Sequence, residues 1–99
     1  MAVYMILEIE VVDAETYGEY VRQAPETVEQ YGGRYLVRGG TITALAGDWD
    51  PQRLVVIEFP TMERFQEWLT SPEYSAIAPL RERSTKGKVI VVEGVEDSP

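Results

Sequence analysis

The sequence contains neither cysteine nor histidine, and each absence excludes a class of chemistry. Without cysteine the chain has no disulfide, no thiolate nucleophile and no thiolate metal ligand. Without histidine it has no Ser-His-Asp triad, no Cys/His zinc site and no histidine-ligated haem. Acid-base chemistry must therefore come from Asp, Glu, Tyr, Lys, Arg, water or a ligand, and we expect neither a metal nor a cofactor.

Positive charge is also scarce. Nine basic residues against seventeen acidic ones give a formal net charge of -8 at pH 7, which repels phosphate backbones and anionic membrane surfaces. No apolar run is long enough to cross a bilayer, and no basic and apolar leader precedes the first predicted strand. We therefore expect a cytoplasmic protein with no nucleic-acid partner and no membrane partner.

The residues that are present alternate and repeat in a way that predicts four strands and two helical regions. The first helix begins at a capping Asp13 and is interrupted by Pro25, where we expect a kink or two abutting segments. Thr61 caps the second helical region, and Ser71 caps a further segment with proline at its first position. The predicted strands cover Val3–Val12, Arg34–Ala46, Arg53–Phe59 and Lys88–Glu93.

This order, β-α-β-β-α-β, predicts a ferredoxin-like α+β domain in which one antiparallel sheet carries its helices on one face. We expect a single domain over residues 1–95 and a flexible tail over residues 96–99. The strands alternate so that their second face is largely apolar too, and such a face needs a cover. A second copy of the same sheet is the economical cover, so we predict a homodimer with a barrel-like core.

The hairpin formed by the second and third strands raises two questions. Gly39-Gly40 fits either a tight turn or a bulge or bend, and we favour the bulge or bend. Arg38 and Glu58 place charges inside apolar strands, where charges are rarely buried without a partner. Three interpretations stay open. The two residues form a structural ion pair, or they are simply exposed to solvent, or they form a functional pair in which Arg38 anchors an anion and Glu58, with a raised pKa, moves a proton.

Four further residues are candidate ligand contacts, each with a structural alternative. Trp49 lies in the hairpin loop, where it packs on a neighbouring surface or covers a ligand, and Asp48 either caps the turn or contacts the ligand. Tyr74 follows a helix start and offers a phenolic donor, although core packing is its simpler role. Arg81 begins a basic stretch that either compensates a helix dipole or binds an anion.

Several short motifs in a fixed order resemble the family known as domain of unknown function 1330. They are Tyr31-Gly32-Gly33, Arg38-Gly39-Gly40, Gly47-Asp48-Trp49, Ile57-Glu58-Phe59 and Ser71-Pro72-Glu73-Tyr74, followed by Leu80-Arg81. The resemblance covers about Val3 to Gly94 and implies the dimeric α+β barrel fold. Its superfamily includes cofactor-independent monooxygenases, haem-degrading enzymes, lactone isomerases and ligand-binding modules, and the missing histidine argues against the branches that bind haem through it.

Two functional hypotheses follow. The first is a homodimer that binds a small organic molecule, anionic or aromatic, and transforms it as a metal-free monooxygenase or isomerase. The second is a non-enzymatic ligand-binding or assembly domain whose charges only fix the dimer. A cavity lined by the charges favours the first, and a dry subunit contact favours the second.

Overall fold

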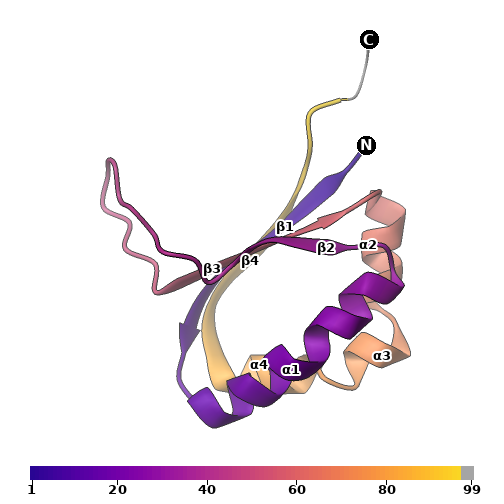
Figure 1. Ribbon diagram of the computed structural model, residues 1–99, viewed down its shortest axis with the longest axis horizontal. Helices are drawn as coiled ribbons and strands as arrows, with labels where there is room; N and C mark the ends of the chain where they lie inside the picture. Colours follow the sequence, from indigo (N-terminus) through magenta and orange to yellow (C-terminus); the bar gives the residue numbers. More distant parts are fainter. Residues whose placement is uncertain (97–99) are drawn as a thin grey trace.

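The computed structural model describes residues 1–96, so most of the predicted tail lies outside the described residues. It confirms the predicted fold: one antiparallel sheet in the order β2-β3-β1-β4 carries the helices on one face (Figure 1). We call the helix side the covered face and the other side the open face. The elements are β1 (Val3–Val11), α1 (Ala14–Gln30), β2 (Arg34–Arg38), β3 (Arg53–Phe59), α2 (Met62–Leu69), α3 (Pro72–Ser75), α4 (Ala78–Ser84) and β4 (Thr85–Glu93).

The central strand β1 sets the two faces. It pairs with β3 on one side and with β4 on the other, and every second residue of its first part is buried. Because strand side chains alternate, Leu7 points under the helices while its neighbours Ile6 and Glu8 point to the open face.

Helix α1 is one continuous helix, so the predicted pair of abutting segments is wrong. Asp13 caps it as predicted, accepting a hydrogen bond of 3.2 Å from the Thr16 amide. Pro25 removes one helical hydrogen bond but stays inside the helix. The buried stripe continues on both sides of Pro25, with Tyr20 before it and Val28 after it. Packing on the sheet therefore holds the helix together.

The hairpin differs from its prediction in two respects. Strand β2 ends at Arg38, and residues 39–52 form an irregular loop that projects from the sheet (Figure 1). The chain bends at Gly39, as one form of the prediction has it, but the irregularity in the ladder lies between Tyr35 and Val37. An extra residue in one strand reverses the alternation beyond it, so Arg38 joins the covered face with its partner Val55.

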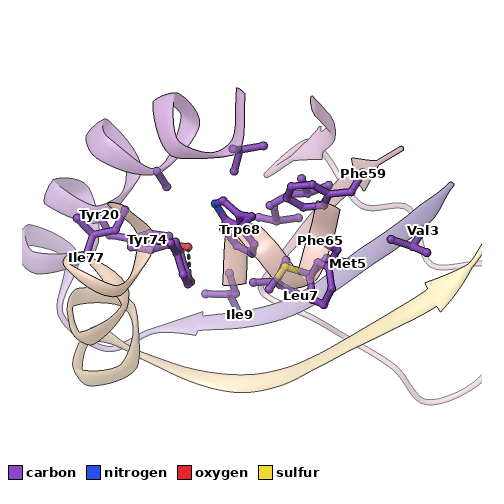
Figure 2. Packing of buried hydrophobic residues seen from close by; sticks show 14 of the residues in the cluster. Val3, Met5, Leu7, Ile9, Tyr20, Phe59, Phe65, Trp68, Tyr74 and Ile77 are labelled. Carbon is purple, nitrogen blue, oxygen red and sulfur yellow. Dashed lines mark hydrogen bonds between the residues drawn. The ribbon is translucent and has the colours of Figure 1, made fainter. Parts of the chain in front are cut away.

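The short helices close the core over the middle of the sheet. Ser71 caps α3 as predicted, and Tyr74 and Ile77 are buried. Trp68 is fully buried, with its ring centroid 5.2 Å from that of Phe59 and 4.0 Å from that of Tyr74 (Figure 2). The separation of Trp68 from Phe59 lies in the range in which aromatic pairs add to the stability gained from burial alone.

The open face keeps its apolar side chains in solvent in the single subunit. Ile90 is 59% exposed and Val92 is 45% exposed, and both pair with open-face residues of β1. Apolar area of this kind on one side of a sheet is typical of an interaction surface. Within residues 1–96, none of the helices combines the length and the apolar character that a membrane span requires.

Candidate functional site: an arginine-tyrosine pocket

A small cavity lies between α1 and the covered face of the sheet. Its volume is about 20 Å³, which is room for about one water molecule. Apolar side chains from β1, β3 and α1 form much of its wall, and no carboxylate is among the described residues that line it. Its polar lining comes from Tyr17, Tyr20, Tyr35, Arg38 and Arg53, and we call this set the arginine-tyrosine pocket.

Arg53 is held beside the cavity by Tyr17. Its Nε donates a hydrogen bond of 3.1 Å to the Tyr17 hydroxyl, and its Cζ lies 5.5 Å from the centre of the Tyr17 ring. Arg53 opens β3 and Tyr17 lies in the second turn of α1, so the contact joins sheet and helix. A phenol orients the guanidinium without neutralising it, so the positive charge is kept.

Arg38 stands at the edge of the same pocket over another phenol. Its Cζ lies 5.0 Å from the centre of the Tyr35 ring, within cation-π range. Burial raises the pKa of Tyr35 to about 12, although the Arg38 cation acts in the opposite direction. Tyr35 is therefore neutral near pH 7 and can donate a hydrogen bond.

A chain of hydrogen bonds leads away from the pocket. The hydroxyls of Tyr20 and Tyr74 lie 3.0 Å apart, as the dashed line in Figure 2 marks. Arg81 Nε donates to the Tyr74 hydroxyl at 3.3 Å. Burial raises the pKa of Tyr20, so its hydroxyl is neutral as well. Two of the predicted contacts, Tyr74 and Arg81, thus bond to each other and connect to the pocket through Tyr20.

The arginines of this region are not paired with a carboxylate in the part of the chain that the structure describes. Among residues 1–96, no carboxylate oxygen lies within 4.0 Å of a nitrogen of Arg38, Arg53 or Arg81. The chain has a net charge of -8 and therefore more carboxylates than cations. In this region, however, the cations lie beside apolar and phenolic side chains. The arrangement is suited to an organic anion, because guanidinium groups donate paired hydrogen bonds to carboxylate oxygens.

Glu58 and Arg38 do not form the expected pair. Glu58 lies on the open face and accepts a hydrogen bond of 2.7 Å from Arg34 Nε, which stands directly opposite it on β2. The bulge in β2 explains the difference, since without it Arg34 and Arg38 would share a face. Hydrogen bonds from Arg34 and Tyr4 lower the pKa of Glu58, so the predicted raised pKa is wrong for this subunit.

The predicted loop contacts lie apart from the pocket. Trp49 is 60% exposed, and its Nε1 donates a hydrogen bond of 2.8 Å to Glu8 Oε1. Glu8 belongs to the open face, so Trp49 lies at the edge of that face. Asp48 is exposed beside it. Within residues 1–96, no group of three or more acidic side chains could hold a metal ion.

Sequence reasoning missed Arg53, Tyr17, Tyr20 and Tyr35 as members of the site. The helical spacing of Tyr17 predicts its burial, which is correct, but this spacing does not indicate that an arginine contacts its ring. The available signal was the position of Arg53 at the start of a strand that is otherwise apolar.

Comparison with known proteins adds a family and a fold. The family model described as Domain of unknown function (DUF1330) matches residues 2–95. A comparison with curated proteins returned no significant match. The chain is similar to the crystal structure of the RPA0582 protein of unknown function from Rhodopseudomonas palustris, with 19% identity and a TM-score of 0.80 over 96% of this chain and 83% of that one.

Two further solved structures share the fold at low identity. SnoaB from Streptomyces nogalater, described as a cofactor-independent oxygenase, is 17% identical with a TM-score of 0.65 over 99% of this chain and 97% of that one. HapK from Hahella chejuensis is 14% identical with a TM-score of 0.64 over 98% of this chain and 96% of that one. These likenesses show that the chain shares the α+β fold of these proteins.

Proposed function

Because this chain belongs to the DUF1330 family, whose fold it shares with a cofactor-independent oxygenase, we propose that it binds a small organic anion in the arginine-tyrosine pocket of a homodimer. The observation that carries the proposal is the pair Arg38 and Arg53, which face an apolar cavity with no carboxylate partner in the described chain. The ligand supplies the missing negative charge, and its apolar body lies against the aliphatic wall.

The ligand enters by displacing Tyr35 and Arg38. The cavity of about 20 Å³ is too small for an organic molecule. An open groove of about 260 Å³ runs along the outer side of the same two residues, between α1 and β2. Arg38 is exposed, and exposed side chains change rotamer on the picosecond to nanosecond scale. Movement of these two side chains joins the groove to the cavity.

The chemistry that fits this lining is stabilisation of an enolate or phenolate oxygen. Guanidinium donors and neutral phenols placed around an apolar site favour a negative charge that develops on the ligand. The pocket holds no carboxylate to remove a proton, so we propose a ligand acidic enough to ionise on its own. The reaction class is metal-free oxygenation or isomerisation.

The open face supports the homodimer. Its side chains include the exposed Ile90 and Val92 and the half-buried Val56, and covering this apolar area is favourable. The charges of the face come in both signs, with Lys88 opposite Glu8 across the ladder. A second copy therefore meets both an apolar centre and charges of either sign. In the non-enzymatic alternative, the protein is either a ligand-binding domain without turnover or an assembly domain, and in the assembly domain this interface is the whole function and the pocket stays empty.

Binding of matched acids and amides tests the proposal. The probes are benzoate, salicylate and 2-naphthoate, each paired with its neutral amide, and calorimetry or NMR titration gives the affinities. We expect one or more acids to bind about tenfold tighter than the amide, and Arg53→Met to remove that preference. The control is Arg64→Met, which removes a cation that is paired with Glu67 on α2. Equal binding of acid and amide by the wild type, or no binding of any probe, contradicts the proposal.

A further inference from the structure

We infer that Gly39 is a positioning residue: its lack of a side chain lets Arg53 take the orientation that gives the pocket its preference for anions. The inference rests on the proposed function, because it explains how the cation of that pocket is set in place. It extends the proposal to a residue outside the pocket lining.

The space beside Gly39 is already occupied. A Cβ atom built on Gly39 would overlap Nη1 of Arg53 and lie 2.7 Å from its Cζ. Real Cβ atoms do not approach neighbours this closely, so any other residue at position 39 forces the guanidinium to move. The guanidinium of Arg53 therefore occupies the space in which a side chain at position 39 would begin. Only glycine leaves that space free.

The hairpin explains why the two residues meet. Gly39 is the first residue after β2, and its amide donates a hydrogen bond of 2.9 Å to the Leu54 carbonyl. Arg53 is the first residue of β3 and precedes Leu54. This bond holds the end of β2 against the beginning of β3. The guanidinium of Arg53 thus lies against Gly39 at the end of the hairpin where the pairing of β2 with β3 stops.

Tyr17 completes the arrangement. It accepts the hydrogen bond from Arg53 Nε, so Nε is occupied and the two terminal nitrogens remain as donors for an anion. A side chain at position 39 presses on the guanidinium and breaks the contact with Tyr17. The pocket then keeps its apolar wall and loses its oriented cation.

The chain offers a matched control for backbone effects. Gly39 has φ +74 and Gly47, in the same loop, has φ +79. Alanine at either position is strained in the same way, because positive φ disfavours a side chain. Around Gly47 no heavy atom lies within 4 Å of a built Cβ. Gly47→Ala therefore imposes the strain alone, and Gly39→Ala imposes the strain and the displacement of Arg53.

The test combines a signal that needs no ligand with the acid and amide probes. The side-chain Nε–H resonance of Arg53, identified by its loss in Arg53→Lys, reports the hydrogen bond to Tyr17. We expect it to keep its position in Gly47→Ala and to shift in Gly39→Ala. The acid-over-amide preference falls about tenfold in Gly39→Ala and is unchanged in Gly47→Ala. Adding Gly39→Ala to Arg53→Met has no further effect on the preference.

The outcomes separate the inference from the proposed function. An unshifted Arg53 resonance in Gly39→Ala overturns the inference, whatever the probes do. A shifted resonance with an unchanged preference also overturns it. If Arg53→Met itself keeps the acid preference, the proposed role of Arg53 is wrong, and the inference falls with it. Should Gly39→Ala not fold, Gly39→Asn replaces it, because asparagine tolerates positive φ while still carrying a side chain.

Discussion

The arginines on the two faces of the sheet have different hydrogen-bond partners. On the open face, Arg34 is paired with the carboxylate of Glu58 at 2.7 Å, and the side chain of Arg34 is 71% exposed. On the covered face, Arg53 is hydrogen-bonded to the hydroxyl of Tyr17. The first pair cancels its charge in solvent, whereas the second orients a cation that stays charged beside an apolar cavity. A carboxylate on the covered face would compete with any anionic ligand, and its absence from the described lining leaves that position to the ligand.

The largest expected effect comes from shortening a buried side chain on the covered face. Leu7 is 2% exposed in the core under the helices, so Leu7→Ala removes buried apolar contacts and leaves a cavity. We expect the free energy of unfolding to fall by about 2–5 kcal/mol, measured by urea unfolding. A loss below about 1 kcal/mol contradicts the burial of this face.

The next effect comes from a charge on the open face. Ile90 is 59% exposed in the single subunit, and a dimer that covers this face buries it. Ile90→Asp then places an unpaired carboxylate in the interface, and we expect the dimer dissociation constant to rise by about 100-fold. Sedimentation equilibrium measures this constant. Leu69→Asp, at an exposed apolar position on α2, is the control that should leave the dimer intact. An unchanged dissociation constant in Ile90→Asp places the interface elsewhere.

A smaller effect concerns alkaline pH and the covered face. Burial raises the pKa of Tyr35 from 10.0 to about 12, so the folded state keeps a proton that the unfolded state releases. The free energy of unfolding therefore falls as the pH rises from about 10 to about 12. In Tyr35→Phe this part of the pH dependence is removed, and the stability falls less steeply. Urea unfolding at a series of pH values measures both slopes, and equal slopes contradict a buried Tyr35 hydroxyl.

The smallest effect is expected at the ion pair of the open face. The hydrogen bond from Arg34 lowers the pKa of Glu58 below 4.5, so its stabilising contribution is present above that value and lost as the pH falls through the folded pKa. Glu58→Gln should therefore lower the melting temperature slightly at pH 7 and by a smaller amount at pH 3. An equal decrease at both pH values means that charge is not the cause.

Glu58→Gln also addresses the catalytic role predicted from the sequence, which stays a prediction. A proton-transfer role requires that the variant folds and loses turnover. Unchanged turnover assigns Glu58 to structure alone. Glu58 and Arg38 lie on opposite faces of the sheet. They can therefore act in the same reaction only if both faces contribute to its site.

Local sequence signals were sufficient for the order of the elements. The caps Asp13, Thr61 and Ser71 and the alternation of β1 predict the helix starts and the apolar faces that the structure contains. These signals depend on residues close together in the chain, and β-α-β-β-α-β order restricts the topology further. The order of the elements could therefore be predicted, whereas the length of β2, the place of the irregularity in its ladder, the start of β4 and the continuity of α1 could not.

Which residues reach the site depends on a shift of one residue in the pairing of β2 with β3. Local sequence patterns do not determine this register. The extra residue between Tyr35 and Val37 moves Arg38 to the covered face, and nothing in the sequence of β2 marks it. The contact of Arg53 with Tyr17 joins residues 36 positions apart. Such a contact follows only from the packing of α1 on the sheet.

The central claim is that an anion is bound on the covered face and not on the open face. The most direct measurement follows the side-chain Nε–H resonances of Arg34, Arg38 and Arg53 during one titration with the tightest-binding acid of the probe panel. We predict that the Arg38 and Arg53 resonances shift together along one binding curve while the Arg34 resonance stays in place. A shift of Arg34 alone, or no shift of Arg53 at saturation, would contradict the account.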